Sequence, residues 1–446
     1  MNKIRLAYDI SSLGTYFSWP DSKTGIYRVA EEILNQVIQS DELDTTLVGL
    51  CGEAPAFTSL GCRKYFEFWQ EQNSSNSKSC EVNFQSTYES HIHLRWLYEA
   101  IYNRYFSKDF QKKNKRSLES LLIRGPLKLM DLMKLARLDT YRIFTPDDFD
   151  ILHSTYYKLP PRELTQDLPR LITIYDLIPL TAKEFVNPKL NSYFYQILDS
   201  VSHEQDWVAC ISEYTRREFC KYTGFPEDRT YVTYLAADDI FTPIDNLDDI
   251  ERVRQSNNIP EAPYFLCLAS HLDPRKNIFH LIKSFVRLIR ENPSLDVNLV
   301  LIGTLRFKRE DVTKALQEFD DYRHRIIFTG YVADEDLSAI YNGSVAFVFP
   351  SLYEGFGLPV LEAMQSGTPV ISSNSTSLPE VTGNAAILVD PQDEDALCQA
   401  MLTLLSDESL RQQMIEKGLA RAKLFSWQKC AAETIDIYKT IVASHG

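Results

Sequence analysis

The sequence lacks an apolar run long enough to cross a bilayer, and its eight cysteines include no Cys-x-x-Cys pair. A spanning helix needs about 20 consecutive apolar residues, so none is expected here. Cysteines without the spacing of a disulfide framework or a metal site favour reduced thiols in a cytosolic protein. No signal peptide precedes the first apolar strand pattern, and we therefore expect a cytoplasmic location.

An excess of positive charge is missing as well. Lysine and arginine number 47 against 61 aspartates and glutamates, which gives a formal net charge of −14. This balance argues against a general nucleic-acid-binding protein and favours a soluble one. The 446 residues exceed what one hydrophobic core usually supports, so two domains of about 200 residues each are expected.

The most informative segment is a strand, a glycine-bearing turn and a helix start between residues 345 and 363. Residues 345–349 are apolar, with β-branched and aromatic side chains, which predicts a buried parallel strand. Gly355 and Gly357 allow the backbone to turn tightly and to approach a ligand, and Pro359 suits the first turn of a helix. The free N–H groups at that helix start favour an anion.

Two glutamates flank this turn, eight positions apart. Glu354 lies in the loop at the carboxyl end of the strand, and Glu362 falls one turn into the helix, so both can face the same crevice. Ionised carboxylates there accept hydrogen bonds from sugar hydroxyls. The segment therefore predicts a nucleotide-sugar pocket; the alternative is an ordinary strand-turn-helix with solvated glutamates.

This segment resembles the Glu-x7-Glu signature of glycosyltransferase family 4, which comprises retaining enzymes with the two-domain GT-B fold. The resemblance implies that Glu362 binds the nucleotide ribose and that Glu354 contacts the transferred sugar. It also implies that four backbone N–H groups meet sugar hydroxyls and the diphosphate. These belong to Gly355, Phe356, Gly357 and Leu358.

A second strand-loop-helix pattern, at residues 264–289, resembles the start of the family's C-terminal domain. Lys276 matches the lysine that neutralises the leaving diphosphate, and Arg275 is a second candidate cation, since such charges stabilise negative charge as it develops. Many members carry another arginine where this sequence has Ser270 and His271. Taken alone, an Arg-Lys pair after a strand is more often a solvated surface.

Two motifs of the first half continue the resemblance. Gly25, before a helix expected from residue 26 to 37, matches a family glycine near the diphosphate; alone it is equally a simple loop glycine. Residues 171–180 read as a buried strand and resemble the family's His-Asp-Leu segment, with Tyr175 in place of the usual histidine. A phenol hydrogen-bonds a hydroxyl but cannot become cationic as imidazole can. Asp176 either orients neighbouring groups or caps the following turn.

Two further positions are assigned by resemblance to the nucleotide. Gly303, which follows a strand predicted at residues 297–302, borders the nucleotide in the family, and the backbone of Tyr331 and Val332 meets the base. Main-chain contacts leave little trace of base identity in the side chains. GDP, UDP and ADP therefore all stay open as the donor nucleotide.

The resemblance implies an α/β protein with the GT-B fold, in which two doubly wound Rossmann-like domains face a central cleft. Residues 1–242 form the expected acceptor-binding domain, residues 243–425 the nucleotide-sugar-binding domain, and residues 426–446 a helix that crosses back to the first domain. The implied reaction moves a hexose from a nucleotide-diphosphate donor to an acceptor hydroxyl with retention, giving an α-linkage. Neither a cofactor nor a metal is expected, because Lys276, Arg275 and helix amides meet the diphosphate.

Three short motifs, at residues 24–28, 176–180 and 273–277, look most like those of mannosyltransferases of bacterial surface polysaccharides. GDP-mannose is therefore the first choice of donor, with UDP-glucose and UDP-N-acetylglucosamine open. The acceptor is a glycan, a lipid-linked molecule or a small molecule. Two other classes remain: a sugar phosphorylase or nucleotide-sugar epimerase of the same architecture, and a non-catalytic nucleotide-sugar-binding protein, which the departure at Tyr175 keeps open.

Residues 94–142 run against the acidic trend, with twelve lysines and arginines against five aspartates and glutamates. Their interleaving with aromatic and apolar residues predicts two amphipathic basic helices. Such helices lie on anionic membrane surfaces or hold a phosphorylated lipid carrier, which would place the protein peripherally at the inner face of the membrane. The alternative is that they only cover the first domain, with a solvated charged face.

Overall fold

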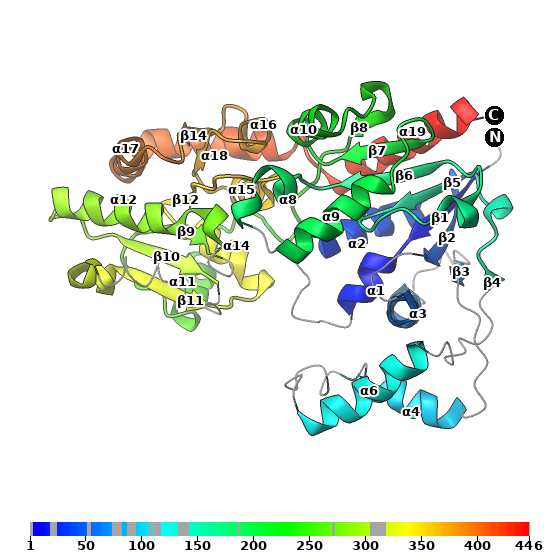
Figure 1. The fold of residues 1–446 in the computed structure, drawn as a ribbon. Coiled ribbons are helices and arrows are strands. Elements are labelled where there is room, and N and C mark those ends of the chain that lie inside the picture. The colour runs from blue at the N-terminus through cyan, green and yellow to red at the C-terminus, as the bar shows by residue number, and fades with distance from the viewer. Residues whose placement is uncertain are drawn as a thin grey trace.

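In the computed structural model, two parallel β-sheets form the centres of two α/β units (Figure 1). The structure describes residues 3–17, 25–50, 55–73, 83–86, 95–105, 107, 110, 117–132, 142–185, 188–269, 273–303 and 318–445. Ser270 and His271, noted above as a departure from the family loop, lie outside these ranges.

The first sheet has the strand order β4-β3-β2-β1-β5-β6-β7-β8, with every pair parallel. The order runs outward from β1 in both directions, as in a doubly wound fold. The strands are β1 (Ile4–Asp9), β2 (Leu43–Gly49), β3 (Asn83–Ser86), β4 (Arg142–Ile143), β5 (Ile151–Ser154), β6 (Arg170–Ile174), β7 (Asp206–Cys210) and β8 (Thr230–Val232).

The second sheet has the order β11-β10-β9-β12-β13-β14, again entirely parallel. Its strand order reverses between β9 and β12, which is where ligands bind in open α/β sheets. The strands are β9 (Tyr264–Leu268), β10 (Asn298–Ile302), β11 (Ile326–Gly330), β12 (Ala346–Phe349), β13 (Val370–Ser373) and β14 (Ala386–Val389).

Helices cover both faces of each sheet. The first unit contains α1 (Ser11–Phe17), α2 (Ile26–Ile38), α3 (Pro55–Asn73), α4 (Arg95–Tyr105), α6 (Leu118–Leu132), α7 (Arg162–Thr165), α8 (Ile178–Thr181), α9 (Pro188–Asp199) and α10 (Glu213–Thr223). The second contains α11 (Leu247–Ser256), α12 (Ile278–Glu291), α14 (Asp334–Asn342), α15 (Leu358–Gln365), α16 (Leu378–Thr382), α17 (Glu394–Ser406) and α18 (Glu408–Ala422).

Neighbouring strand residues enter different hydrophobic clusters, because side chains alternate across a sheet. Leu171 packs in the cluster that includes α2 residues, whereas Ile172 packs in the one that includes α9 and α10 residues. The same alternation sends Leu266 toward α15 and Phe265 toward α12. Both faces of each sheet are thus buried, which explains the nearly continuous apolar runs in the sequence.

The last helix, α19 (Trp427–His445), follows the second unit in sequence but packs on the first, against α2 and β5 (Figure 1). Tyr438 is fully buried there, and its hydroxyl lies 2.6 Å from Nδ1 of His153. Burial lowers the pKa of His153 to about 3, so the imidazole is neutral at this contact. One hydrophobic cluster also includes residues of both units.

The expectation of a single strand over residues 171–180 is wrong in its second half. Strand β6 ends at Ile174, and α8 begins at Ile178. Pro179 lies in the first turn of α8, where the missing N–H removes no helix hydrogen bond. Asp176 Oδ1 accepts a hydrogen bond of 3.0 Å from the backbone N–H of Ile178, so the carboxylate caps this turn.

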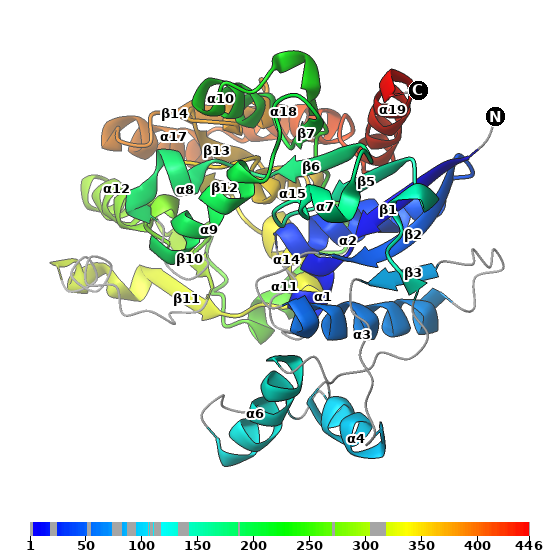
Figure 2. The same cartoon turned by 45° about the vertical axis from the view of Figure 1, so that its right-hand side comes forward.

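Helices α4 and α6 pack against each other beside α3, apart from both sheets (Figures 1 and 2). The remainder of the basic segment predicted at residues 94–142 lies outside the described residues, except for positions 107, 110, 117 and 142. Among the helices that the structure describes, none combines the length and apolarity needed to cross a membrane.

Candidate active site

The loop between β12 and α15 carries the two glutamates that the sequence singles out. Strand β12 ends at Phe349, and α15 begins at Leu358 with Pro359 in its first turn. Glu354 lies in the loop and Glu362 in the helix, with only 7% and 6% of their surfaces exposed. Burial of two carboxyl groups is costly unless charged or polar partners compensate, so their partners are informative.

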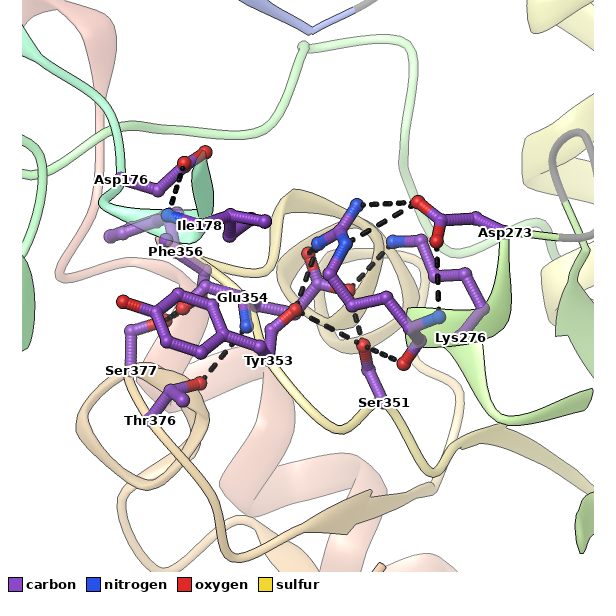
Figure 3. Close-up of polar contacts among 12 residues, drawn as sticks. Asp176, Ile178, Asp273, Lys276, Ser351, Tyr353, Glu354, Phe356, Thr376 and Ser377 are labelled. Carbon is purple, nitrogen blue, oxygen red and sulfur yellow. Dashed lines mark hydrogen bonds and ion pairs between the residues drawn. The ribbon is translucent and has the colours of Figure 1, made fainter. Parts of the chain in front are cut away.

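Glu354 has three partners for its carboxylate (Figure 3). Lys276 Nζ donates to Oε1 at 2.7 Å, Ser351 Oγ donates to the same oxygen at 2.6 Å, and Arg275 Nη1 donates to Oε2 at 2.8 Å. Burial alone would raise the pKa of Glu354, but the charges of Lys276 and Arg275 and these hydrogen bonds lower it below its ordinary value. Glu354 is therefore ionised at neutral pH.

The two cations are held by a short turn after β9. Residues Pro274–Lys276 form one turn of 3₁₀ helix, capped by Asp273, whose side chain accepts a hydrogen bond of 3.0 Å from the N–H of Arg275. Arg275 also donates to the carbonyl of Tyr353 at 2.8 Å. The Lys276 ammonium lies 4.5 Å from the centre of the Phe349 ring. The sequence analysis predicts that these cations bind the diphosphate. In the structure, both form ion pairs with Glu354.

Glu362 receives its partners from two other helices. Arg28 of α2 donates from Nη1 to Oε1 at 3.1 Å, and the hydroxyl of Tyr341 of α14 donates to Oε2 at 3.4 Å. Burial raises the pKa of Glu362 to about 7, against the opposing effect of Arg28. The protonation of Glu362 is therefore sensitive to pH in the neutral range.

Gly355 lies where the second unit touches the first. Its carbonyl accepts hydrogen bonds from Ser212 Oγ at 2.8 Å and Thr215 Oγ1 at 3.3 Å, both near the start of α10. A Cβ atom at position 355 would lie 2.3 Å from the carbonyl oxygen of Tyr175, a distance that does not occur between such atoms. Only glycine allows this approach of the loop to Tyr175.

Tyr175 and Asp176 lie on the first-unit side of this contact. Tyr175 is 8% exposed, and the centre of its ring is 6.1 Å from that of Tyr156. Burial raises the pKa of Asp176, while the charge of Arg275 opposes this rise. Of the two roles that the sequence left open for Asp176, capping is observed. An orienting role toward a ligand stays a prediction.

The predicted nucleotide residues lie at strand ends and a helix start. Gly25 is the N-cap of α2 with φ at +65°, and a Cβ atom added there would have no atom within 4 Å, so its backbone conformation and not crowding favours glycine. The N–H of Gly303 donates to the carbonyl of Gly330 at 2.9 Å, beyond β10. Tyr331 is 75% exposed, whereas Val332 is buried.

Several residues at this contact were not singled out from the sequence. Glu380 accepts hydrogen bonds from the N–H groups of Glu213 and Tyr214, at 2.6 and 3.0 Å, and from the Tyr234 hydroxyl at 2.7 Å. A carboxylate at the first N–H groups of a helix is favourable there. In the sequence, Arg28 was noted only as the last residue of the motif at 24–28. No sequence pattern predicted a role for Ser351 or Glu380.

The arrangement can hold a nucleotide sugar. Cations lie beside Glu354, a second carboxylate lies one turn into α15, and the first N–H groups of that helix come between the two glutamates in the sequence. Within the described ranges, no group of three or more histidine, cysteine, aspartate and glutamate side chains is placed to hold a metal ion.

Comparison with known proteins identifies relatives of this chain. Residues 249–421 match the protein-family model described as glycosyl transferases group 1. The O-antigen chain mannosyltransferase B of Escherichia coli is 34% identical over 336 residues, which are 75% of this chain and 85% of that protein. The serotype-specific mannosyltransferase WbdA of E. coli is 32% identical over 276 residues, 60% of this chain but only 33% of WbdA.

A glycosyltransferase from Rickettsia africae is similar in its solved structure, with a TM-score of 0.62 over 99% of both chains and 14% sequence identity. At this identity the likeness concerns the fold alone. It extends over both α/β units and over α19.

Proposed function

This chain belongs to the group 1 glycosyl transferases, and we propose that it moves mannose from GDP-mannose to a hydroxyl of a glycan acceptor, with retention and an α-linkage. It is a glycosyltransferase with the GT-B fold of two Rossmann-like domains, as the sequence predicted. The mannosyltransferase names of its E. coli relatives support the choice of sugar. Polysaccharide biosynthesis is the corresponding process.

The observation that carries this proposal is the pairing of Lys276 and Arg275 with Glu354 beside the start of α15. In the proposed complex, the two cations and the N–H groups of residues 355–358 bind the diphosphate, and Glu354 accepts hydrogen bonds from the sugar. Glu362 accepts hydrogen bonds from the ribose. Gly25, Gly303, Tyr331 and Val332 contact the rest of the nucleotide through their backbone.

The proposed chemistry needs no side-chain nucleophile. The bond from the anomeric carbon to the phosphate oxygen breaks, the acceptor oxygen bonds to the same face of that carbon, and the acceptor's proton passes to the departing phosphate. Lys276 and Arg275 stabilise the negative charge that accumulates on the diphosphate. For that reason we propose a reaction without metal or cofactor.

The test is a panel of donors: GDP-mannose, UDP-glucose, UDP-N-acetylglucosamine and ADP-glucose, with and without a mannan oligosaccharide as acceptor. Release of nucleoside diphosphate is measured, and the fastest release is expected with GDP-mannose plus acceptor. Faster transfer from another donor would replace mannose in the proposal. Tight donor binding without any transfer or hydrolysis would instead support the non-catalytic binding protein that Tyr175 keeps open.

We also propose that the acceptor is presented at an anionic membrane, because α6 exposes an apolar face. Four leucines of α6 are exposed, by 80%, 62%, 68% and 56%, and their spacing places them on one side of the helix: Leu118, Leu121, Leu122 and Leu129. Leu127, on the opposite side, is buried. The plain alternative, that these helices cover the first domain, does not explain an outward leucine face.

The charge of the surrounding segment indicates what the leucine face meets. Residues 94–142 carry an excess of seven positive charges within a chain of net charge −14. A helix with an apolar face and basic neighbours binds the interface of anionic lipid bilayers. A lipid-linked glycan in such a membrane would bring its hydroxyl to the enzyme.

Replacing both Leu121 and Leu122 by serine is expected to weaken binding to vesicles of phosphatidylglycerol and phosphatidylcholine by about tenfold, because less apolar surface enters the bilayer. Co-sedimentation measures this binding. Leu247→Ser is the matched control, since Leu247 is 75% exposed on α11 of the other unit. Equal binding of all three proteins, or binding that ignores the anionic lipid, would reject the membrane proposal.

A further inference from the structure

Arg28 joins the two domains at the carboxylate proposed to bind the ribose. It lies in the first turn of α2, three residues after Gly25, and its Nη1 donates to Glu362 Oε1 at 3.1 Å. Its Nη2 forms an ion pair with Asp238 Oδ2 at 3.2 Å, and its guanidinium carbon lies 5.6 Å from the centre of the Phe241 ring. The side chains of Arg28 and Glu362 are 19% and 8% exposed.

The hydrogen bonds to Glu362 use only part of the acceptor capacity of its carboxylate. Oε1 accepts from Arg28 and Oε2 from Tyr341. An ionised carboxylate offers about four acceptor positions, so two are left for the two hydroxyls of a ribose. Arg28 therefore need not leave Glu362 when a nucleotide binds.

The same contacts set the charge of Glu362. Burial raises the pKa of Glu362 to about 7, the charge of Arg28 lowers it, and the charge of Asp334 on α14 raises it further. Tyr341 lowers it through its hydrogen bond, and Asp238 faces the group through Arg28. A protonated carboxyl has one acceptor position fewer and carries a donor in its place, so the ionised form is the better partner for two hydroxyl donors.

We propose that Arg28 is a positioning residue for donor binding, which reaches from the first domain to keep the Glu362 carboxylate ionised and oriented toward the nucleotide. The nucleotide site is then complete only when the two domains are together. This inference rests on the proposed function, in which Glu362 binds the ribose. It adds a residue of the acceptor-side domain to the donor site.

The test is the affinity for a nucleoside diphosphate, measured by calorimetry between pH 6 and 9 for four proteins: unchanged, Arg28→Met, Arg28→Lys and Glu362→Gln. GDP and UDP are both tried, and the tighter one is used. The affinity of the unchanged protein is expected to rise with pH around 7, as Glu362 ionises. In Arg28→Met, the pH at which the affinity rises is expected to be higher by about one unit or more. The affinity at pH 7 therefore falls up to about tenfold and recovers at pH 9.

Two further variants test the charge of residue 28 and the ionisation of residue 362. Arg28→Lys keeps the positive charge. Its affinity is therefore expected to rise at nearly the same pH as that of the unchanged protein. Glu362→Gln has no group to ionise and is expected to bind weakly with little change over the same range, apart from the titration of the nucleotide itself.

The outcomes distinguish this inference from the proposed function. An unchanged pH profile in Arg28→Met, or a loss that is equal at every pH, would reject the role of Arg28 while Glu362→Gln still binds weakly. If Glu362→Gln binds as tightly as the unchanged protein, the ribose assignment fails, and the proposed function of Glu362 fails with it.

Discussion

Replacing Lys276 by alanine is expected to lower turnover by about 10²- to 10³-fold, the usual effect of removing one preorganised charge from a reacting centre. Only 13% of the Lys276 side chain is exposed, so few water molecules can take the place of its ammonium group in the variant. The diphosphate gains a further negative charge as the sugar bond breaks, so the loss should appear in kcat more than in the Michaelis constant of the donor.

Steady-state release of nucleoside diphosphate from GDP-mannose measures this effect. Lys283→Ala is the matched control, because Lys283 also pairs with a glutamate, Glu394 at 2.7 Å, but is 48% exposed on α12. The control should keep nearly normal turnover. A Lys276→Ala protein that folds and turns over like the control would remove Lys276 from the chemistry.

Replacing Glu354 by glutamine is the second change with a large expected effect, about 10²-fold in turnover. Glutamine keeps the size of the side chain but loses the charge that orders Lys276 and Arg275 and loses one acceptor for sugar hydroxyls. Glu354→Ala should also lower the stability by about 3–5 kcal/mol, because it leaves the poorly exposed Lys276 without its anion and Arg275 with Asp273 alone.

The pH dependence of stability tests independently whether Glu354 is ionised in the folded protein. Its pKa is lowered in the folded protein, so the ionised carboxylate stabilises the fold above its unfolded pKa, and this contribution is lost as the pH falls through the lowered value. Thermal unfolding of the unchanged protein and of Glu354→Gln should therefore differ at pH 7 and converge in acid. A difference that is independent of pH would contradict an ionised Glu354.

The contacts of Lys276 and Arg275 leave N–H groups for a second partner. Lys276 has three N–H donors and uses one for Glu354, whereas Arg275 uses four of its five donors for Glu354, Tyr353 and Asp273. The lysine thus keeps two donors for a diphosphate without leaving Glu354. The glutamate fixes the position of both cations before the donor arrives, which lowers the reorganisation needed for reaction.

The local parts of this site could be predicted from the sequence, because neighbouring residues determine them. The apolar run ending at Phe349, the glycines of the following loop and Pro359 at the helix start are sufficient to predict strand, turn and helix. The strand expected over residues 171–180 failed because Ile178 and Leu180 are as apolar as a strand requires. The opposing signal was Asp176, whose carboxylate accepts a hydrogen bond from the N–H of Ile178, together with Pro179 in the first helical turn.

The contacts between the domains could not be predicted in this way. Arg28 and Glu362 are 334 positions apart, and Ser212 and Gly355 are 143 apart. Periodicity shows that a helix has an apolar face but not which neighbour covers it. For the same reason the sequence predicted amphipathic helices at residues 94–142 without showing that the leucines of α6 face outward.

The site proposed between Glu354 and Glu362 is tested most directly by a crystal structure of the protein with GDP-mannose or its unreactive analogue bound. We expect the diphosphate within hydrogen-bond distance of Lys276 and of the N–H groups that begin α15, the ribose on Glu362 and the mannose on Glu354. A donor bound at another place, or one in this place whose ribose and sugar contact neither glutamate, would contradict it.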